Sequence, residues 1–307
     1  MPRPLRVATR GSELARWQAN RVAALLGGDV ELVIVTTIGD ARTDVPIHAV
    51  GGTGIFVKEV QQAVLDGRAD LAVHSAKDLP ASGTPDGIVL IAVPERADPR
   101  DVLVGSTLAA LPAGARVGTG SVRRRAQLAA LRPDLTFAEL RGNVPTRLER
   151  AVEFDAIVVA AAALERLGLA DRATEYLEPS VMLPQVGQGA LAVECRTDDP
   201  ETHERLAAID DTRAHAAVGA ERAFLAQLGG GCDLPVGALA TVDGGEIVVE
   251  ALLAALDGHV VLRATARDAS PIDAGMAVAA QLLDRGGRSL LDDETGFGSA
   301  GRRNEPT

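Results

Sequence analysis

Short β-branched runs alternate with helical patterns over the first two thirds of the chain, and this alternation restricts the fold more than any other feature. We expect strands at residues 6–9, 31–38, 70–74, 89–93, 116–118, 156–160 and 190–194. Helical periodicity fills the intervals at residues 13–26, 55–65, 122–131 and 161–167. Ser12 is suited to cap the first helix and Gly67 to end the second. Such alternation predicts α/β domains with largely parallel sheets.

The pattern changes after about residue 210. An Ala-rich helix is expected at residues 212–227, followed by a glycine-rich loop. Two strands at 246–256 and 259–266 flank an Asp-Gly pair, which is a hairpin signal. A last helix is expected at about residues 274–283. This part therefore predicts a smaller C-terminal α+β domain, whereas the aperiodic tail at 296–307 is expected to be disordered.

Two polar or Gly/Pro-containing segments mark crossings between domains, at residues 95–101 and 182–190. Two α/β lobes joined by two crossings, with a ligand cleft between them, resemble the periplasmic-binding-protein architecture. We expect domain 1 to cover residues 1–96 with 188–209, domain 2 to cover 97–187, and domain 3 to cover 210–295.

Composition and charge exclude several functions. The 307 residues suffice for two or three domains. Aromatic residues make up only 2% and the net charge is −11, so base stacking and nucleic-acid binding are not expected. Two cysteines cannot build a disulfide framework, which favours a reducing compartment. Neither an apolar leader nor a membrane-length apolar stretch is apparent, so we expect a cytoplasmic protein with no membrane partner.

Arginines gather near predicted element ends. The segment VGTGSVRRRAQL places Arg123, Arg124 and Arg125 in the first turn of a helix, where cations oppose the helix dipole. A bound anion would explain this arrangement, and a solvated basic helix face is the alternative. Further arginines beside glycines or element ends are Arg10, Arg141, Arg147 and Arg166. Together they suggest a ligand with several carboxylates or phosphates, although no nucleotide-binding glycine motif is present.

A buried strand ends in polar residues at ADLAVHSAKDLP, residues 69–80. Asp78 could stabilise a developing cation or shuttle a proton there, or it could merely cap the following turn. The five histidines show no metal-ligand spacing with the cysteines, so no metal site is expected. Cys195 lies in an apolar strand and is expected to be buried and inert. Cys232, in LGGGCDLPVG, is expected to be accessible on a glycine-rich loop.

In this order, the motifs closely resemble one family, the porphobilinogen deaminases or hydroxymethylbilane synthases. The resemblance runs from about residue 6 to 240. It is highly specific, because it rests on all of these motifs together and not on any single short one. The matching stretches are ATRGSELARWQA, GIFVKEVQQAVLDGRADLAVHSAKDLP, DPRD, VGTGSVRRRAQL, LRGNVPTRL, VGQGALAVECR and ERAFLAQLGGGCDLPVGA.

The resemblance implies an activity in tetrapyrrole (porphyrin and heme) biosynthesis. Such an enzyme joins four porphobilinogen units head to tail, loses ammonia at each step and releases linear hydroxymethylbilane. It implies a dipyrromethane cofactor attached by a thioether to Cys232, and Asp78 as the catalytic carboxylate that stabilises a cationic azafulvene. It also implies a monomer. The implied cofactor- and substrate-binding residues are Arg10, Ser12, Lys58, Ser75, Lys77, Thr119, Ser121, Arg123, Arg124, Arg141, Arg147, Arg166 and Gln188.

Two positions depart from the pattern of many relatives. Thr53 stands where many carry lysine, and Gly120 where many carry serine. We expect weaker cofactor contacts rather than lost activity, because the arginines and Asp78 are present.

The sequence leaves two other classes of protein open: a non-enzymatic polyanion-binding protein of the two-lobed type, and a thiol-dependent redox protein. The latter is disfavoured by the absence of a CxxC motif.

Overall fold

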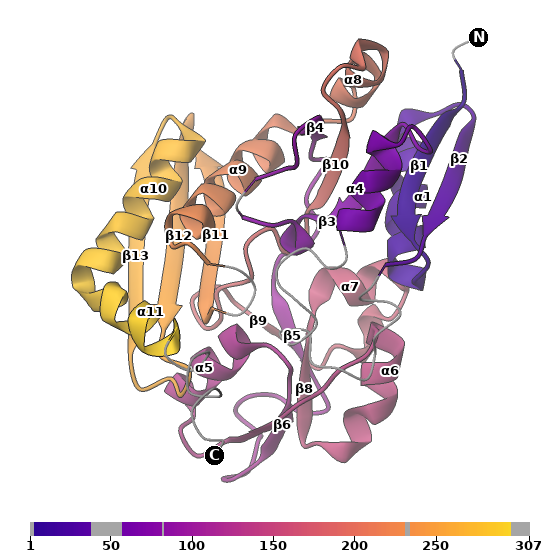
Figure 1. The fold of residues 1–307 in the computed structure, drawn as a ribbon. Coiled ribbons are helices and arrows are strands. Elements are labelled where there is room, and N and C mark those ends of the chain that lie inside the picture. Colours follow the sequence, from indigo (N-terminus) through magenta and orange to yellow (C-terminus); the bar gives the residue numbers. More distant parts are fainter. Residues whose placement is uncertain (1–2, 38–56, 82, 231–233, 296–307) are drawn as a thin grey trace, which may run out of the picture.

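The computed structural model describes residues 3–37, 57–81, 83–230 and 234–295. Its described strands form two five-stranded sheets and one three-stranded sheet. Figure 1 shows two α/β lobes, one above the other, with a smaller domain along one side of both. The predicted architecture of two α/β lobes and a smaller C-terminal α+β domain is confirmed. The exact domain boundaries stay predictions.

Lobe 1 is built on a sheet with the strand order β2-β1-β3-β10-β4. Its second strand ends at Val35, earlier than predicted, and the described part of the second predicted helix begins at Lys58. The elements are β1 (Leu5–Arg10), α1 (Glu13–Leu26), β2 (Val30–Val35), α4 (Lys58–Leu65), β3 (Leu71–Ser75), the 3₁₀ turn η1 (Ala76–Asp78), β4 (Ile88–Ala92), β10 (Leu191–Arg196) and α8 (Pro200–Ala207).

Lobe 2 has the strand order β7-β6-β8-β5-β9. Its three strands β5, β7 and β9 are short and were not predicted from the sequence pattern. The elements are β5 (Asp101–Val104), β6 (Arg116–Gly118), α5 (Val122–Leu131), β7 (Thr136–Ala138), α6 (Val144–Glu149), η2 (Arg150–Glu153), β8 (Ala156–Ala160), α7 (Ala161–Arg166), η3 (Ala170–Arg172) and β9 (Glu175–Leu177).

The prediction of largely parallel sheets is wrong, because the sheet of each lobe mixes parallel and antiparallel pairs. In lobe 1, β10 pairs antiparallel with both β3 and β4, and in lobe 2, β5 pairs antiparallel with both β8 and β9. These two are the first strands after the chain crosses between lobes. Each crossing brings the chain into the middle of a sheet from the opposite end, which reverses its direction.

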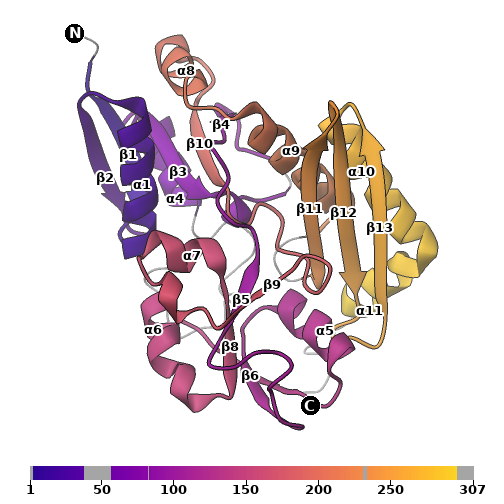
Figure 2. The same ribbon diagram turned by 180° about the vertical axis from the view of Figure 1, so that it is seen from behind.

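The third domain packs a three-stranded antiparallel sheet against two helices (Figure 2). It contains α9 (Thr212–Gln227), β11 (Val236–Asp243), β12 (Glu246–Ala254), β13 (Val261–Asp268), α10 (Pro271–Leu282), a π-helical turn at Leu283–Gly287 and α11 (Arg288–Thr295). The helix at 212–227 and the hairpin between β12 and β13 were predicted, but β11 was not. Gly237 lies within β11, where a Cβ would approach the Leu183 carbonyl oxygen at 2.8 Å, so close backbone packing explains a glycine in this strand.

The cores consist mainly of Ala, Val, Leu and Ile, as the composition indicates. Phe224 is the one aromatic side chain in the buried apolar core of the described residues. One cluster fills the third domain, and a smaller one joins Ala126 of α5 to Leu252 and Ala254 of β12. The third domain is therefore fastened to lobe 2 through the helix that begins with the predicted anion-binding arginines.

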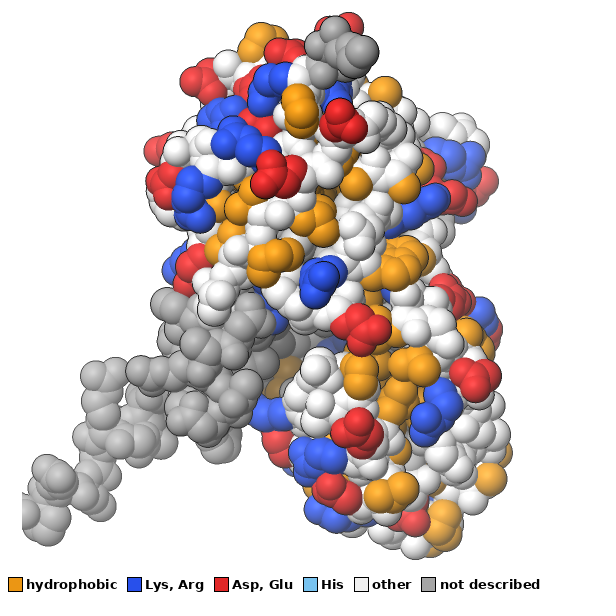
Figure 3. Space-filling model, turned by 90° about the vertical axis from the view of Figure 1, so that its right-hand side faces the viewer, with side chains coloured by type: hydrophobic (Ala, Val, Ile, Leu, Met, Phe, Trp, Pro, Cys, Tyr) orange, Lys and Arg blue, Asp and Glu red, His pale blue; other side chains and the backbone are white. Residues whose placement is uncertain are grey.

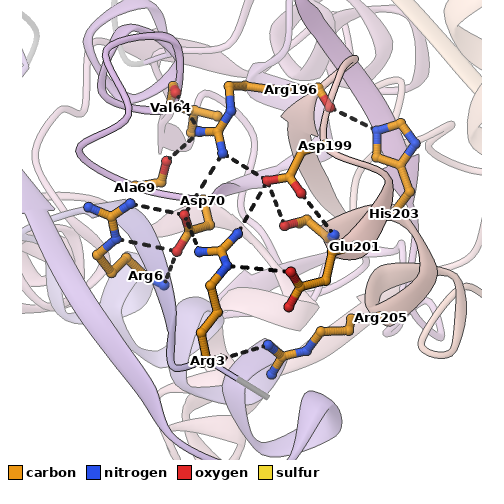
Figure 4. A network of polar contacts seen from close by, with 11 residues as sticks. Arg3, Arg6, Val64, Ala69, Asp70, Arg196, Asp199, Glu201, His203 and Arg205 are labelled. Carbon is orange, nitrogen blue, oxygen red and sulfur yellow. Dashed lines mark hydrogen bonds and ion pairs between the residues drawn. The ribbon is translucent and has the colours of Figure 1, made fainter.

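A buried carboxylate ties the edge of lobe 1 together (Figure 4). Asp70 is 1% exposed and accepts hydrogen bonds from the backbone and guanidinium of Arg6, and Arg3 lies 2.8 Å away. Arg196 of β10 lies 3.9 Å from it and binds Asp199. Burial alone would raise the pKa of Asp70, but the hydrogen bonds from Arg6 and Arg3 lower it from 3.8 to about 2.

Replacing Asp70 with asparagine should reduce the free energy of unfolding by about 2 kcal/mol at pH 7. Because the folded pKa is depressed, the stabilisation is present above the unfolded pKa of about 4 and is lost as the pH falls towards 2. Urea unfolding at pH 7, 4 and 3 should therefore show a gap between the two proteins that narrows with acid. The exposed carboxylate variant Asp66→Asn serves as control. A gap that stays constant with pH would contradict the assignment.

Candidate active site

Asp78 and its neighbours lie where the lobe 1 sheet meets the interior of the molecule. Arg10 ends β1, and Ser12 caps α1 by accepting a hydrogen bond from the Ala15 backbone at 3.3 Å. Ser75 ends β3, and the turn η1 follows directly. Because the carboxyl ends of adjacent parallel strands share one edge of the sheet, these residues gather there.

A pocket in lobe 1, called here the lobe 1 pocket, brings four predicted site residues together. Gln18 and His74 also line it, and the Gln18 amide donates a 2.8 Å hydrogen bond to the Ser75 hydroxyl. Asp78 contributes the one carboxylate among its described lining residues. The predicted site residues in this pocket are Arg10, Ser12, Ser75 and Asp78.

A second cavity, called here the three-domain cavity, is lined by both lobes and the third domain. Lys77 lines it from lobe 1, Ser121 and Arg123 from lobe 2, and Arg222 and Leu234 from the third domain. Lys77 and Asp78 are adjacent in the chain and yet face two different cavities. The 3₁₀ turn explains this, since successive side chains on such a turn point about 120° apart.

The electrostatic setting of these two residues is strongly cationic. Burial lowers the pKa of Lys77 from 10.5 to about 8, Asp78 opposes this effect, and Arg124 and Arg147 add to it. Burial likewise lowers the pKa of Arg147 to about 10, together with repulsion from Arg124 and Arg141. Asp78 lines the lobe 1 pocket beside this positive field, where its carboxylate oxygens can accept hydrogen bonds from a ligand.

Asp101 holds the predicted arginine cluster in place. It is completely buried and contacts Arg123 at 2.7 Å, Arg124 at 2.8 Å and the amide of Gln188 at 3.0 Å. Burial would raise the pKa of Asp101, but the two guanidinium groups lower it well below its usual range. Arg124 also donates to the Val158 carbonyl at 2.8 Å. Both arginines are therefore partly engaged by the protein itself, leaving fewer N–H groups for a ligand than the sequence pattern suggests.

Replacing Asp101 with asparagine should lower the free energy of unfolding by about 3 kcal/mol, because two buried guanidinium groups lose their shared counter-charge. Urea unfolding measures the effect. Asp98→Asn is the matched control, since Asp98 lies in the same segment and pairs with Arg100 at a partly exposed site. We expect that control to lose about 1 kcal/mol or less. Equal losses in the two variants would show that Asp101 does not hold the cluster.

Arg166 links the lobes from α7. It donates to the Gly189 carbonyl at 2.6 Å, and its guanidinium lies 5.7 Å from the ring centre of Trp17 on α1. Burial lowers the pKa of Arg166 to about 10. Gly189 adopts φ of +84°, and a Cβ there would come within 2.5 Å of the Ala97 carbonyl oxygen. The two crossing segments therefore lie in direct contact beside this arginine, which only glycine permits.

The structure does not place every predicted site residue in a pocket. Lys58 is exposed at the start of α4, and Arg141 forms a 2.6 Å ion pair with Glu139. Thr119 and Gln188 are buried and make internal hydrogen bonds. The predicted residues that line neither cavity are Lys58, Thr119, Arg124, Arg141, Arg147, Arg166 and Gln188.

The predictions for the two cysteines, and for the two positions that differ from many relatives, have different outcomes. Cys232 and Thr53 lie outside the described residues. Cys195 is buried, as predicted, and burial raises the pKa of its thiol from 9.0 to about 12. At Gly120, a Cβ would lie 3.1 Å from a Glu139 carboxylate oxygen, so the glycine suits its crowded surroundings.

Sequence reasoning missed Asp101, Gln18, His74 and Arg222 as parts of the site. Asp101 had a readable signal, because it opens the buried strand DVLV and a carboxylate in such a place needs a partner. His74 lies 3.2 Å from the buried Glu194 of β10, a pairing that depends on strand order and gives no local signal.

The visible face in Figure 3 carries intermingled blue and red side chains over both lobes. No broad basic surface appears on its coloured part. Four cations instead line the two cavities: Arg10 lines the lobe 1 pocket, and Lys77, Arg123 and Arg222 line the three-domain cavity. A site shielded from water strengthens the interaction of such cations with a carboxylate.

The fold and the site together define a class of protein that binds a polyanionic ligand between domains. It has two α/β lobes, a third domain, and cavities lined by cations and one carboxylate. Comparison with known proteins identifies the family within this class. Residues 5–204 match the family model described as "Porphobilinogen deaminase, dipyromethane cofactor binding domain", and residues 215–284 match "Porphobilinogen deaminase, C-terminal domain". The chain belongs to the porphobilinogen deaminase family.

Curated relatives match along nearly their whole length. A porphobilinogen deaminase of Roseiflexus sp. (strain RS-1) is 51% identical over 304 residues, covering 95% of this chain and 99% of that protein. One of Acidithiobacillus ferrooxidans is 48% identical over 303 residues, with the same coverage. Among solved structures, a periplasmic binding protein of Salmonella typhimurium gives a TM-score of 0.38 at 14% identity, covering 68% of this chain and 92% of that one.

Two negative findings apply to the described residues alone. No group of three or more His, Cys, Asp or Glu side chains is arranged to hold a metal ion. None of the helices there has the length and apolar character needed to span a membrane.

Proposed function

We propose that this chain is a hydroxymethylbilane synthase, which condenses four porphobilinogen units head to tail into linear hydroxymethylbilane. One observation carries the proposal beyond family membership: Asp78 and Lys77 face two separate cavities from one turn. The lobe 1 pocket suits an incoming substrate, and the three-domain cavity suits the attached chain. The relatives' names favour this enzyme over a non-enzymatic polyanion-binding protein.

The donor groups that line the three-domain cavity suit the carboxylates of a dipyrromethane. The Arg123 Nε group is buried there without a hydrogen-bond partner, and Lys77 lines the same cavity. Cofactor carboxylates would supply the missing acceptor. When bound, the dipyrromethane supplies the pyrrole end on which the chain grows. We assign its thioether to Cys232, because Leu234, two positions later in the chain, lines this cavity.

The residues of the lobe 1 pocket act on porphobilinogen. Arg10, Ser12 and Ser75 bind its acetate and propionate groups, which orients the aminomethyl carbon towards Asp78. The C–N bond then breaks, and its electron pair leaves with ammonia, so positive charge develops on the pyrrole ring. The Asp78 carboxylate stabilises that charge. A new C–C bond forms at the aminomethyl carbon, and the displaced pyrrole α-proton leaves.

The remaining predicted residues are proposed to hold carboxylates of the growing chain. Arg147 supports this role, because it lies close enough to Asp78 and Arg124 for their charges to change its pKa. Arg141 is partly exposed and could exchange Glu139 for a ligand carboxylate. The other proposed contacts are Lys58, Thr119, Ser121, Arg124, Arg166 and Gln188.

We further propose that the protein acts in the cytoplasm as a monomer that does not bind nucleic acid. The net charge of −11 supports the last point, because it repels phosphate backbones. The proposed domain boundaries are those predicted above, at residues 96/97, 187/188 and 209/210. The sheet memberships of β4, β5 and β10 support the first two.

Intact mass spectrometry of the purified protein tests the function. The wild-type protein should carry the added mass of two condensed pyrrole units, and brief incubation with porphobilinogen should add further single-unit steps. Cys195→Ala is the control and should keep the adduct, since the Cys195 thiol is buried. A wild-type protein that carries no adduct, even after incubation, would favour the polyanion-binding alternative.

A further inference from the structure

Two neighbouring charged residues on α9 differ sharply in how their charges are satisfied. Glu221 is completely buried, forms a 2.6 Å ion pair with Arg96, and accepts hydrogen bonds from the Gly187 and Ala240 backbone at 2.7 and 2.9 Å. Arg222 follows it directly, and its Nη1 atom is buried with no hydrogen-bond partner. Glu221 therefore fastens α9 to the crossing segments, whereas Arg222 is left with an unused donor.

The protein itself offers Arg222 little compensation. Burial lowers its pKa, and Glu194 is the carboxylate that opposes this effect. Glu194 is already engaged, because the Gln61 amide donates to it at 2.9 Å and His74 lies 3.2 Å away. A buried cationic donor without an acceptor costs more free energy than most single contacts recover. Its presence therefore indicates an acceptor that comes from a ligand.

The place of Arg222 indicates which ligand. Arg222 lines the three-domain cavity together with Arg123, whose Nε is also buried and unpartnered. One of these guanidinium groups comes from the third domain and the other from lobe 2. Leu234 and Val236 of the third domain line the same cavity. Two unused guanidinium donors from two domains thus border one enclosed space, an arrangement suited to carboxylate groups.

We propose that Arg222 binds a carboxylate of the dipyrromethane in the three-domain cavity, opposite Arg123. This inference rests on the proposed function. Since α9 and β11 pack together within the domain that carries Cys232, Arg222 belongs to the same packed unit as the proposed attachment point. Arg222 therefore holds the anchored end of the chain throughout elongation. Its removal should impair loading and retention of the cofactor more than the KM for porphobilinogen.

The test compares Arg222→Gln and Arg222→Lys with wild type and with Arg213→Gln. Arg213 is the matched control, an exposed arginine on the same helix that donates to the Val242 carbonyl. Each protein is produced without cofactor in a host that cannot make porphobilinogen, and is then incubated with porphobilinogen. Intact mass spectrometry follows adduct formation, and thermal unfolding is measured before and after loading.

We expect Arg222→Gln to load at least about tenfold more slowly than wild type, the loss that a charged hydrogen bond of this kind predicts. It should also gain less thermal stability on loading. Arg222→Lys should recover part of both, and Arg213→Gln should match wild type. These readouts isolate the contact with the ligand, because the unloaded proteins provide the reference for folding.

Two results would overturn the inference while leaving the proposed function intact. Arg222→Gln could load at the wild-type rate with the full thermal gain. Alternatively, Arg222→Gln could lower the unfolding temperature by the same amount with and without cofactor, and Glu194→Gln could lower it equally. That result would show that Arg222 stabilises the fold through Glu194 and does not bind the ligand. A wild-type protein that acquires no adduct would instead reject the proposed function itself.

Discussion

Replacing Asp78 with asparagine should lower kcat by about 1000-fold while the protein stays folded and keeps its cofactor. Asparagine fills nearly the same space but carries no charge, and Asp78 is the one carboxylate among the described residues that line the lobe 1 pocket. Lys77, Arg124 and Arg147 surround it with positive potential that would otherwise oppose a developing cation. Removing a preorganised stabilising group of this kind typically costs 10²–10³ in kcat, and a full charge belongs at the upper end.

Three measurements define the result for Asp78→Asn. Steady-state kinetics give kcat and KM, intact mass shows whether the adduct is present, and thermal unfolding confirms the fold. Asp86→Asn is the control, because Asp86 is exposed shortly before β4 and lines neither cavity. A variant that keeps more than a tenth of the wild-type kcat would remove Asp78 from its role. A rise in KM alone would reassign it to substrate binding.

The sequence predicted that Lys77 and Asp78 belong to the site, but not that they would line different cavities. The motif HSAKD places Lys77 and Asp78 at the end of a buried strand, and the structure has them there. Whether consecutive side chains share a pocket depends on the conformation of the turn. A loop and a 3₁₀ turn look alike in sequence, and only the latter directs the two charges into separate spaces.

The arginine cluster shows a different limit of sequence reasoning. The run of three arginines was recognised as unusual for a helix start, but its structural partner was not found. Asp101 lies 22 positions from Arg123 and reaches it because β5 runs antiparallel beside β8. That strand order follows from the chain crossing between lobes, which local periodicity does not encode. Part of the cationic signal is thus accounted for by the fold itself.

Arg222 carried even less signal in the sequence. It stands in an Ala-rich helix beside Glu221, where the pair resembles an ordinary solvated charge pair. Only the tertiary structure distinguishes them, since Glu221 forms an ion pair with Arg96 across the domain boundary and the Nη1 atom of Arg222 is buried without a hydrogen-bond partner. Unpartnered buried donors become visible only when every neighbour is placed.

Replacing Cys232 with alanine should yield a folded protein with no adduct and no detectable turnover. A thioether requires a sulfur atom, and Cys195 is no substitute, because it is fully buried and burial raises the pKa of its thiol to about 12. The Cys232→Ala protein should also unfold at a lower temperature than the loaded wild type, because a ligand held by the folded state alone stabilises it. That temperature should match the wild-type protein produced without cofactor.

This match separates loss of the anchor from damage to the fold. If Cys232→Ala unfolded well below the cofactor-free wild type, its inactivity would report misfolding instead. Cys195→Ala, with its adduct and turnover retained, is the second control. The assignment of Cys232 fails if its alanine variant still gains pyrrole units or releases product, because the chain would then grow from another group. In that event Arg222 and Arg123, which border the cavity, would mark where to search for the attachment.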